Sequence, residues 1–599
     1  MIHEKMTGPL FPLLASVKRP GRYTGGEWGT FAAEDPAYGP RLTRMCLAFP
    51  DVYEVGMSYL GYQILYSLIK TLDYADAERA YCPWPDMEGA MRRAGMPLGA
   101  LESGRPLRDF DAVGFTLQYE LCATNIITML DLGGIPILSA DRDDGDPIVI
   151  GGGSGACAPA PFEIFFDAFC IGDGEETAPK ILAVLHELRG RGRAEKLDAL
   201  ARLESVYVPG AGGASAAIVN DLDEGFIHRT MIVPNIGIIH DRAAIQVSRG
   251  CTRGCRFCQA GMIGRPRRER GAESVESQLK DLLRYTGWDE AALLSLSTCD
   301  WMGLNEFMSS MRDYLEKNNV RLSFPSLRMD SFSVELASGL EAMRHGGITF
   351  APEAGSERLR QVVNKGLSDD EIDAALDAAF KHGWEKAKLY FMMGLPTETT
   401  DDLDGIIDIA DRAVRCARAN RRKGGVSVSV AGFVPKPHTP FQWEAQMSRD
   451  ELRERGRYIK GRIKSKKISL SYHEPSQTFL EGVFARGDAS IGMAALEAWR
   501  RGARFDGWTE CFDMARWECV FRDLGIDMEY FATRKRNSDE PLPWDVIDVR
   551  VTKEFLKLER ERAMKGESTP DCAKGACNAC GWQGLFPGCG GAAAPGEGD

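Results

Sequence analysis

AAIQVSRGCTRGCRFCQAG, residues 243–261, places an apolar, strand-like run directly before a loop with three cysteines. Cys251, Cys255 and Cys258 have the spacing C-x3-C-x2-C. A structural metal site usually closes with four ligands, so a set of three leaves one position open for a substrate or a cofactor. Thiolates favour soft metals and iron–sulfur clusters, and we expect these three to hold a four-iron cluster. The alternative is a zinc knuckle that a distant residue completes.

The loop belongs to a repeating pattern of strands and helices. Amphipathic helical stretches separate six strand-like runs: AAIQVSRG, AALLSLST, VRLSFPS, GITFAPE, AKLYFMMG and VSVSVAGFVP. Six such units in about 220 residues predict a barrel, or part of one, of parallel strands over residues 240–470. The cysteine loop follows the first strand, at the carboxyl-end face where barrel enzymes place their chemistry. The interleaved Arg249, Arg253 and Arg256 are expected to favour the thiolate forms.

The N-terminal half has an α/β pattern of its own. Short apolar runs alternate with helical periodicity, which predicts a Rossmann-like, doubly wound domain over residues 41–235 after an extension of residues 1–40. Gly151, Gly152 and Gly172 follow strands of this pattern. Such sheets bind ligands at the carboxyl ends of their strands, against loops without side-chain bulk. The predicted fold class is therefore α/β, a Rossmann-like domain followed by a (β/α)6 barrel.

The strand pattern fades after the barrel. Residues 471–565 are rich in tryptophan and predict a helical region. Residues 566–599 are rich in glycine, alanine and cysteine and have no core pattern. Four thiolates in so small a segment suit structural zinc, with an auxiliary iron–sulfur cluster or unligated thiols as the alternatives. The cysteines of this tail are Cys572, Cys577, Cys580 and Cys589.

Composition excludes several classes of protein. The net charge of −13 argues against a uniformly basic surface that coats nucleic acid. Two basic runs, residues 265–270 and 453–467, could still contact RNA phosphates, although a solvated helix face is the more common role. No run approaches the ~18 consecutive apolar residues that span a bilayer. The start of the chain has no cleavage signal, so we expect a cytoplasmic protein without a membrane and with reduced cysteines.

The cysteine loop resembles the cluster loop of the radical S-adenosylmethionine (SAM) superfamily, whose hallmark is C-x3-C-x2-C. The resemblance implies that Cys251, Cys255 and Cys258 hold a 4Fe-4S cluster and that SAM chelates the fourth iron. One electron from the cluster would then cleave SAM to a 5′-deoxyadenosyl radical. The resemblance also implies an electron donor such as flavodoxin or ferredoxin. The backbone at Phe257 would contact adenine.

Residues at the later strand ends continue the resemblance. Asp300, in STCDW, stands where the family has a glutamate that holds the methionine amino group, although both glycines of that motif are missing. Glu353, in FAPEAGSERL, would reach the ribose or the amino end of SAM, and Gly394, in YFMMGLPTET, would allow close approach. FVPKPHTPFQW is similar to the segment next to adenine. Arg328, in FPSLRMD, is placed to pair with a carboxylate.

The N-terminal domain resembles the cobalamin-binding-type Rossmann domain that precedes the barrel in many radical SAM proteins. The D-x-H-x-x-G signature of base-off cobalamin binding is absent, so cobalamin would bind without a protein axial ligand, or the domain would serve the substrate. We expect an enzyme that modifies an unknown substrate (RNA, protein or small molecule), by methylation if cobalamin is bound. Methylthiolation is the alternative if the tail holds a second cluster. An iron–sulfur electron carrier or metal-binding scaffold is the non-enzymatic alternative.

Overall fold

A six-stranded sheet forms the centre of the N-terminal domain, in the order β2-β1-β3-β4-β5-β6. The computed structural model describes residues 11–34, 41–324, 328–330, 347–422, 424–587 and 589. The strands are β1 (Thr43–Phe49), β2 (Ala75–Tyr81), β3 (Ala112–Thr116), β4 (Ile148–Gly152), β5 (Ala168–Cys170) and β6 (Val206–Tyr207). The first five are parallel, and β6 is antiparallel to β5. The strand order reverses between β1 and β3, at the switch point where such sheets bind ligands.

Helices cover both faces of this sheet, as a doubly wound domain requires. Along β1, Met45 and Leu47 pack with α4 (Leu60–Ile69) and α7 (Gly174–Glu187). Cys46 and Ala48 belong to the apolar core on the other face, with α5 (Pro85–Ala94) and α6 (Ala123–Leu132). This alternation follows from the two-residue period of a strand. The predicted α/β class is confirmed.

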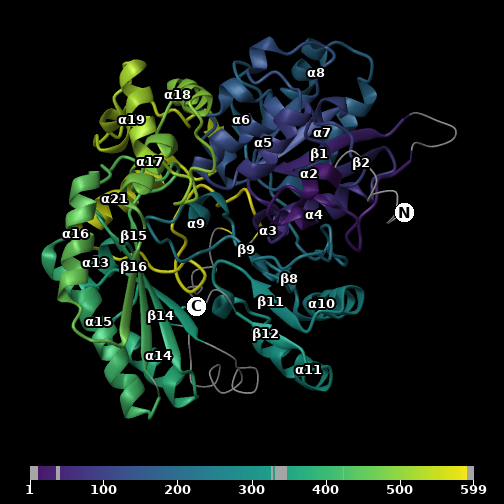
Figure 1. Ribbon diagram of the computed structural model, residues 1–599. Helices are drawn as coiled ribbons and strands as arrows, with labels where there is room; N and C mark the ends of the chain where they lie inside the picture. Colours follow the sequence, from purple (N-terminus) through teal and green to yellow (C-terminus); the bar gives the residue numbers. More distant parts are fainter. Residues whose placement is uncertain are drawn as a thin grey trace, which may run out of the picture.

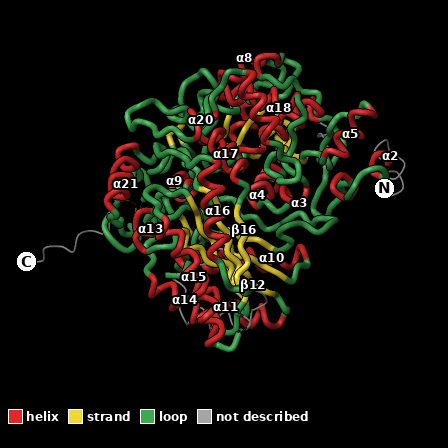
Figure 2. The backbone as a smooth tube through the Cα atoms, turned by 60° about the vertical axis from the view of Figure 1, so that its left-hand side comes forward, coloured by secondary structure: helices red, strands yellow, loops and turns green. Residues whose placement is uncertain are grey.

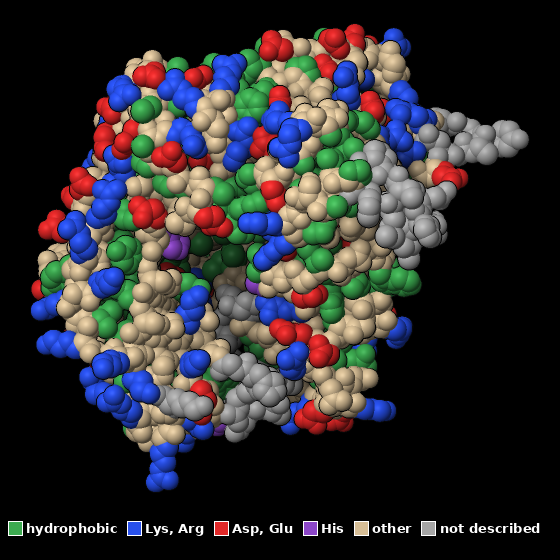
Figure 3. Space-filling model, in the orientation of Figure 1, with side chains coloured by type: hydrophobic (Ala, Val, Ile, Leu, Met, Phe, Trp, Pro, Cys, Tyr) green, Lys and Arg blue, Asp and Glu red, His purple; other side chains and the backbone are tan. Residues whose placement is uncertain are grey.

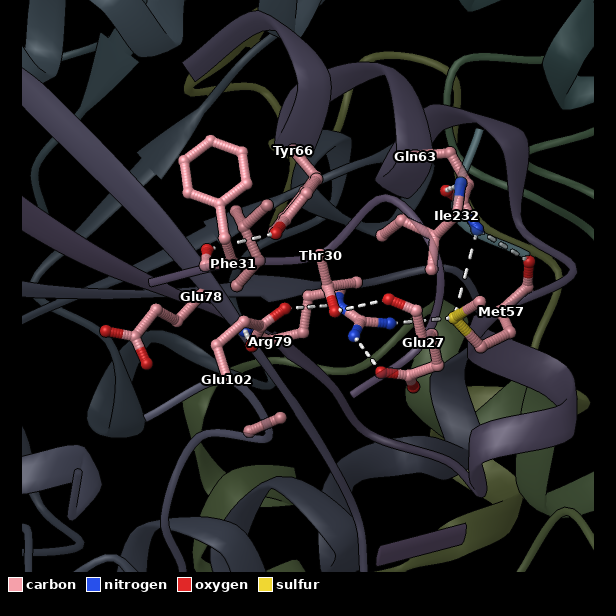
Figure 4. Close-up of polar contacts among 12 residues, drawn as sticks. Glu27, Thr30, Phe31, Met57, Gln63, Tyr66, Glu78, Arg79, Glu102 and Ile232 are labelled. Atoms are coloured by element: carbon pink, nitrogen blue, oxygen red, sulfur yellow. Dashed lines mark hydrogen bonds and ion pairs between the residues drawn. The ribbon is translucent and has the colours of Figure 1, made fainter. Parts of the chain in front are cut away.

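Apolar periodicity does not reveal β2. Its sequence, ADAERAY, has three charged residues, yet all seven of its residues are buried. The charged side chains have partners from other segments. Arg79, for example, lies between Glu27 and Glu102 (Figure 4). Burial of a charge is tolerated when it is paired and hydrogen-bonded, so this strand forms without an apolar pattern.

The described part of the barrel contains two parallel sheets that share one apolar core. The first, in the order β12-β11-β8, consists of β8 (Ala243–Gln246), β11 (Glu290–Leu294) and β12 (Arg321–Ser323). The second consists of β13 (Ile348–Glu353), β14 (Lys386–Met393), β15 (Gly425–Gly432) and β16 (Ile468–Tyr472). Figures 1 and 2 show helices around the outside of these strands. They include α10 (Ala272–Thr286), α11 (Leu304–Lys317), α14 (Asp369–Lys381), α15 (Thr400–Ala419) and α16 (Arg449–Arg462).

Each of the six predicted barrel runs contains a strand, and β16 is an additional parallel strand beside β15. It spans the predicted boundary at residue 470. Its sequence, ISLSY, has only two aliphatic side chains, Ile468 and Leu470, and most of its residues are exposed. The apolar signal of β16 is therefore too weak to distinguish it from the end of the basic run before it.

The C-terminal region is helical and shares a core with the N-terminal domain. Its helices are α17 (Pro475–Ala485), α18 (Ala489–Arg500), α19 (Met514–Asp523), α20 (Met528–Ala532) and α21 (Lys553–Lys565). Phe479, Ile491 and Trp517 from three of them belong to the same apolar cluster as Ile126 of α6. In Figure 1 these helices lie at the upper left, beside the N-terminal sheet and above the barrel. Among the described residues, we find no helix with the length and apolar character to cross a membrane.

Candidate functional site

The carboxyl ends of the N-terminal sheet and of the barrel strands face each other. Asp173, after β5, lies 3.0 Å from Arg249 at the start of the cysteine loop. His438, after β15, lies with Nε2 2.8 Å from the carbonyl oxygen of Cys157, which follows β4. Figure 3 shows a recess at the centre of this face of the molecule, with apolar side chains at its base. The two regions where α/β domains bind ligands therefore meet at one place.

The three cysteines lie between β9 (Ser248–Arg249) and α9 (Gln259–Ile263). Cys258 begins this helix, and its Sγ accepts a hydrogen bond of 3.3 Å from the backbone N–H of Gly261. Burial raises the pKa of Cys258 to about 12, and the charges of Cys255 and Cys251 add to the rise, so the thiols interact. In the described part of the chain, no group of three or more His, Cys, Asp or Glu side chains is arranged to hold a metal ion.

The arginines of the loop pair with carboxylates of other segments, which contradicts the expectation that they act on the cysteines. Arg249, Arg253 and Arg256 each form ion pairs with acidic residues from distant parts of the chain. The cation beside the thiols is Arg328, whose Nη1 lies 4.0 Å from Sγ of Cys255. Proximity in sequence does not identify the ion-pair partners of these arginines, because the fold brings segments that are distant in sequence next to the loop.

Glu353 and Gly394 lie at the carboxyl ends of strands of the second barrel sheet, as predicted, and Phe257 of the cysteine loop lies close to that sheet. Glu353 ends β13 with a φ of +70°, which non-glycine residues rarely adopt, and strain of this kind is common at functional sites. Its carboxylate lies 3.2 Å from Nζ of Lys365. Gly394 follows β14 with a φ of +84°. Phe257 packs against an apolar cluster that includes Phe433, after β15.

Asp300 ends a short turn after β11 and is held by the cysteine loop. Its Oδ2 accepts hydrogen bonds of 2.9 Å from Nε of Arg253 and 2.6 Å from the hydroxyl of Ser297. Burial raises the pKa of Asp300, but these hydrogen bonds outweigh burial and lower it to about 2. Asp300 is therefore ionised at neutral pH, and its carboxylate forms an ion pair with the guanidinium of Arg253. Its predicted contact with the SAM amino group stays a prediction.

Two family models match successive parts of the chain. Residues 61–209 match the N-terminal domain of radical SAM proteins, and residues 245–410 match the radical SAM superfamily. The chain is a radical SAM enzyme. Its family implies a 4Fe-4S cluster and SAM as cofactors.

Three curated relatives are similar over different lengths. The uncharacterized protein MJ0966 of Methanocaldococcus jannaschii is 28% identical over 397 residues, which cover 65% of this chain and 81% of the relative. The putative methylthiotransferase MJ0865 of the same organism is 24% identical over 40% of this chain and 51% of its own length. The uncharacterized methyltransferase PH0819 of Pyrococcus horikoshii is 27% identical over a region that covers 28% of this chain and 36% of the relative. The chain therefore spans about half and about a third of the last two relatives.

A solved structure shares the fold of this radical SAM enzyme. The radical SAM methyltransferase TsrM from Kitasatospora setae, with cobalamin and a [4Fe-4S] cluster bound, superposes with a TM-score of 0.50. The match covers 77% of this chain and 99% of TsrM at 14% sequence identity. At this identity the likeness establishes the fold alone.

Helix α21 and the segment after it hold the radical SAM cysteine loop through hydrogen bonds and an ion pair. The guanidinium of Arg256 is buried, with Nε 3.1 Å from Glu559 and Nη2 donating to the carbonyl oxygen of Glu567 at 2.7 Å. The amide of Asn364 donates to two carbonyl oxygens of the cysteine loop, both at 3.2 Å, and to the carbonyl oxygen of Thr569 at 3.1 Å. The sequence carries no signal for these contacts, because they join segments about 200 to 300 residues apart.

The glycines of the N-terminal sheet differ in what surrounds them. A Cβ atom at Gly151 would approach Leu117 and Phe169 within 2.9 Å, and one at Gly172 would lie 2.2 Å from the carbonyl oxygen of Ala217. These two glycines allow close packing of the chain on itself. At Gly152 the nearest atom, Cβ of Cys170, would be 3.8 Å away. Gly152 therefore leaves room at the ligand-binding edge, and cofactor binding by all three stays a prediction.

The basic run at residues 265–270 lies largely inside the protein and links the barrel to the N-terminal domain. Arg265, Arg268 and Arg270 are buried, and Nη1 of Arg268 lies 2.6 Å from Asp173 of the N-terminal domain. Neither a solvated helix face nor contact with RNA phosphates, the two roles suggested by the sequence, fits these three buried side chains. The second run lies largely on α16, where Arg455 and Arg462 pair with acidic residues of neighbouring segments. That arrangement fits an ion-paired outer helix.

We expect Asp300→Asn to keep the iron content and to weaken SAM binding about tenfold, because the variant loses a charge-assisted pair that orients Arg253 beside the cysteine loop. The measurement is the dissociation constant of SAM for the anaerobically reconstituted enzyme. Asp289→Asn is the matched control, since Asp289 is exposed and pairs with Arg321 rather than with the cysteine loop. An unchanged dissociation constant for Asp300→Asn would show that Asp300 plays no part in SAM binding.

Proposed function

We propose that this enzyme is a cobalamin-dependent radical SAM methyltransferase. The observation that carries the proposal is the meeting of the two carboxyl-end faces, joined by Asp173 with Arg249 and by Cys157 with His438. A cofactor at the edge of the N-terminal sheet would face SAM across this junction. The cobalamin in the TsrM structure and the methyltransferase name of PH0819 support the same assignment.

The residues at this edge fit cobalamin bound without an axial histidine. Residues 51–56, DVYEVG, have the Asp and the Gly of D-x-H-x-x-G, with Tyr53 at the histidine position. Tyr53 is 1% exposed and packs edge-on against Tyr81, so its ring is part of the core. Burial lowers the pKa of His438 to about 4, and its Nε2 is already hydrogen-bonded. At Gly152, in contrast, a Cβ atom would make only an ordinary contact with Cys170, so the chain does not crowd this position of the edge.

The chain's own residues would position the reactants and exclude water. When bound, the cluster and SAM supply a carbon radical, and cobalamin supplies a methyl group for transfer. Nζ of Lys436 lies 2.5 Å from Glu120 and 2.8 Å from Glu481, and the hydroxyl of Tyr119 donates to Glu481 at 3.2 Å. This group ties the barrel to the N-terminal domain and to α17. Its partly exposed polar atoms are suited to bind a substrate beside the cofactors.

The electron that starts the reaction would come from an external one-electron donor such as flavodoxin or ferredoxin. The substrate class is left open between RNA, a protein and a small molecule. The buried state of the 265–270 run makes it a poor phosphate contact, which weighs against RNA at that position.

Cobalamin binding tests the proposal directly. After anaerobic reconstitution with hydroxocobalamin and removal of the excess, we expect about one cobalamin per chain by absorbance. Gly152→Phe should lose it, because a Cβ atom fits at this position and the ring beyond it would compete for the edge where cobalamin is proposed to bind. The control is Gly461→Phe, at a helix position with no atom within 4 Å. The proposal fails if the wild-type enzyme with a full cluster retains no cobalamin.

Methylthiolation is the second candidate, favoured by the four cysteines of the tail and by the name of the relative MJ0865. It differs in requiring a sulfur atom in the product. Mass spectrometry of a modified substrate separates the two, because methylation adds only carbon and hydrogen.

A further inference from the structure

Arg265, which follows α9, is a buried cation without a carboxylate partner among the described residues. Arg265 is 3% exposed, and its Nη2 has no hydrogen-bond partner. Its Nε donates to the carbonyl oxygen of Gly261 at 3.2 Å, and its guanidinium lies over the ring of Phe555. Among the described residues no carboxylate forms an ion pair with it. Burial of an unpaired charge is unfavourable unless an anion compensates it, so the site calls for one.

Backbone and ring contacts place the tail beside Arg265. Its guanidinium lies over the ring of Phe555, and the backbone N–H of Phe555 donates to the hydroxyl of Thr552. The N–H of Thr552 donates in turn to the carbonyl oxygen of Cys580 at 3.0 Å. Cys580 and Cys589 both pack against the apolar cluster that contains Phe555. All of these cysteines are free. Thiolates gathered around a metal would supply the missing negative charge.

The backbone between Cys577 and Cys580 has a shape suited to thiolates. The N–H of Ala579 donates to Sγ of Cys577 at 3.4 Å. Ala579 has a φ of +51°, a conformation that is unfavourable for an L-residue. The turn therefore directs a backbone N–H at a sulfur, an arrangement suited to a thiolate that a metal holds.

The tail has little else to order it, yet it lies at a defined place. Trp582 is buried in the apolar cluster that the N-terminal domain shares with the C-terminal helices, while most residues around it are exposed. Upstream, Oδ2 of Asp571 lies 3.4 Å from Nε of Arg253 in the radical SAM cysteine loop. The backbone N–H of Thr569 donates to Asn364 at 2.8 Å. Small segments without a core of their own are commonly folded by a metal.

We infer that Cys572, Cys577, Cys580 and Cys589 form a second metal centre, an anionic site of four thiolates that neutralises Arg265 beside the radical SAM cluster loop. Zinc and an iron–sulfur cluster share this ligand chemistry. Binding would draw the four sulfurs inward, since no three of them are arranged for a metal ion here. The inference concerns a different set of ligands from the proposed methyl transfer and does not depend on it.

The test removes the first cluster so that the remaining metal can be counted. A variant with Cys251, Cys255 and Cys258 replaced by alanine is reconstituted anaerobically, once with zinc and once with iron and sulfide. We expect it to retain either about one zinc or about four irons per chain. Adding Cys577→Ser and Cys580→Ser should abolish that metal, and Arg265→Met should lower its retention at least about tenfold. Adding Cys416→Ser, a single cysteine on α15, should change nothing.

Differential alkylation of the wild-type enzyme is a second test whose result does not depend on whether the variants fold. With metal bound, the four tail cysteines should resist iodoacetamide until a strong chelator is added, whereas Cys416 should react throughout. A folded loop variant that holds neither zinc nor iron, together with tail cysteines that alkylate equally fast with and without the chelator, would overturn the inference.

Discussion

Cys255→Ala is expected to abolish SAM cleavage, lowering 5′-deoxyadenosine formation at least about 100-fold. The family's cluster is held by only three thiolates, so the loss of one leaves too few ligands to keep the cluster and its open iron. Cys255 is also the thiol nearest Arg328, with 4.0 Å between Nη1 and Sγ. The measurement is anaerobic: the protein is reconstituted with iron and sulfide, reduced and given SAM, and 5′-deoxyadenosine is quantified by mass spectrometry.

Cys416→Ala is the matched control for this experiment. Cys416 is a half-buried cysteine near the end of α15, and its sulfur lies 3.8 Å from the amide nitrogen of Asn420 and 3.9 Å from the carboxylate of Asp377 on α14, not in the cysteine loop. Its variant should cleave SAM as the wild type does. Equal product from Cys255→Ala and the wild type would contradict the ligand assignment. A wild-type enzyme with a full cluster and no product, even with cell extract added, would favour the electron-carrier alternative.

The order of strands and the position of the cysteine loop could be predicted because they depend on local pattern. Apolar runs such as AKLYFMMG coincide with strands, and a loop that follows a parallel strand lies at its carboxyl end. The same reasoning placed Glu353 and Gly394 at one face of the barrel. β2 was missed because its charged residues are buried by pairing with distant segments. A pattern method counts Asp76 and Glu78 as exposed, and only the tertiary fold shows otherwise.

The partners of charged residues could not be predicted for the same reason. Arg253 and Arg256 lie among the cysteines, yet they pair with Asp300 and Glu559, which come from another strand end and from α21. Arg328, which does face a cysteine sulfur, is separated from it by 73 positions. Coulomb energy depends on distance in space and on burial, and neither follows from spacing along the chain.

Arg79→Met is expected to lower the free energy of unfolding of the N-terminal domain by about 3–5 kcal/mol, because it leaves two buried carboxylates without their cation. Arg79 is fully buried, with Nη2 2.9 Å from Glu27 and Nε 2.6 Å from Glu102 (Figure 4). Burial raises the pKa of Glu102, and Arg79 opposes the rise. Denaturant unfolding followed by tryptophan fluorescence measures the loss.

The pH dependence of this loss separates charge from packing. Without Arg79, the folded-state pKa of Glu102 should rise further above its unfolded value, since the opposing charge is gone. A raised carboxyl pKa contributes stability below that pKa and loses it as pH increases, so the deficit should be smaller at pH 5 than at pH 8. Arg321→Met, which removes a half-exposed arginine paired with Asp289, should cost less than about 1 kcal/mol at either pH. A deficit in Arg79→Met that does not change with pH would mean that lost packing, rather than unpaired carboxylates, destabilises the domain.

Because β2 pairs with β1 along its whole length, and β1 forms one side of the switch point, the variant should also retain less cobalamin at pH 8 than at pH 5.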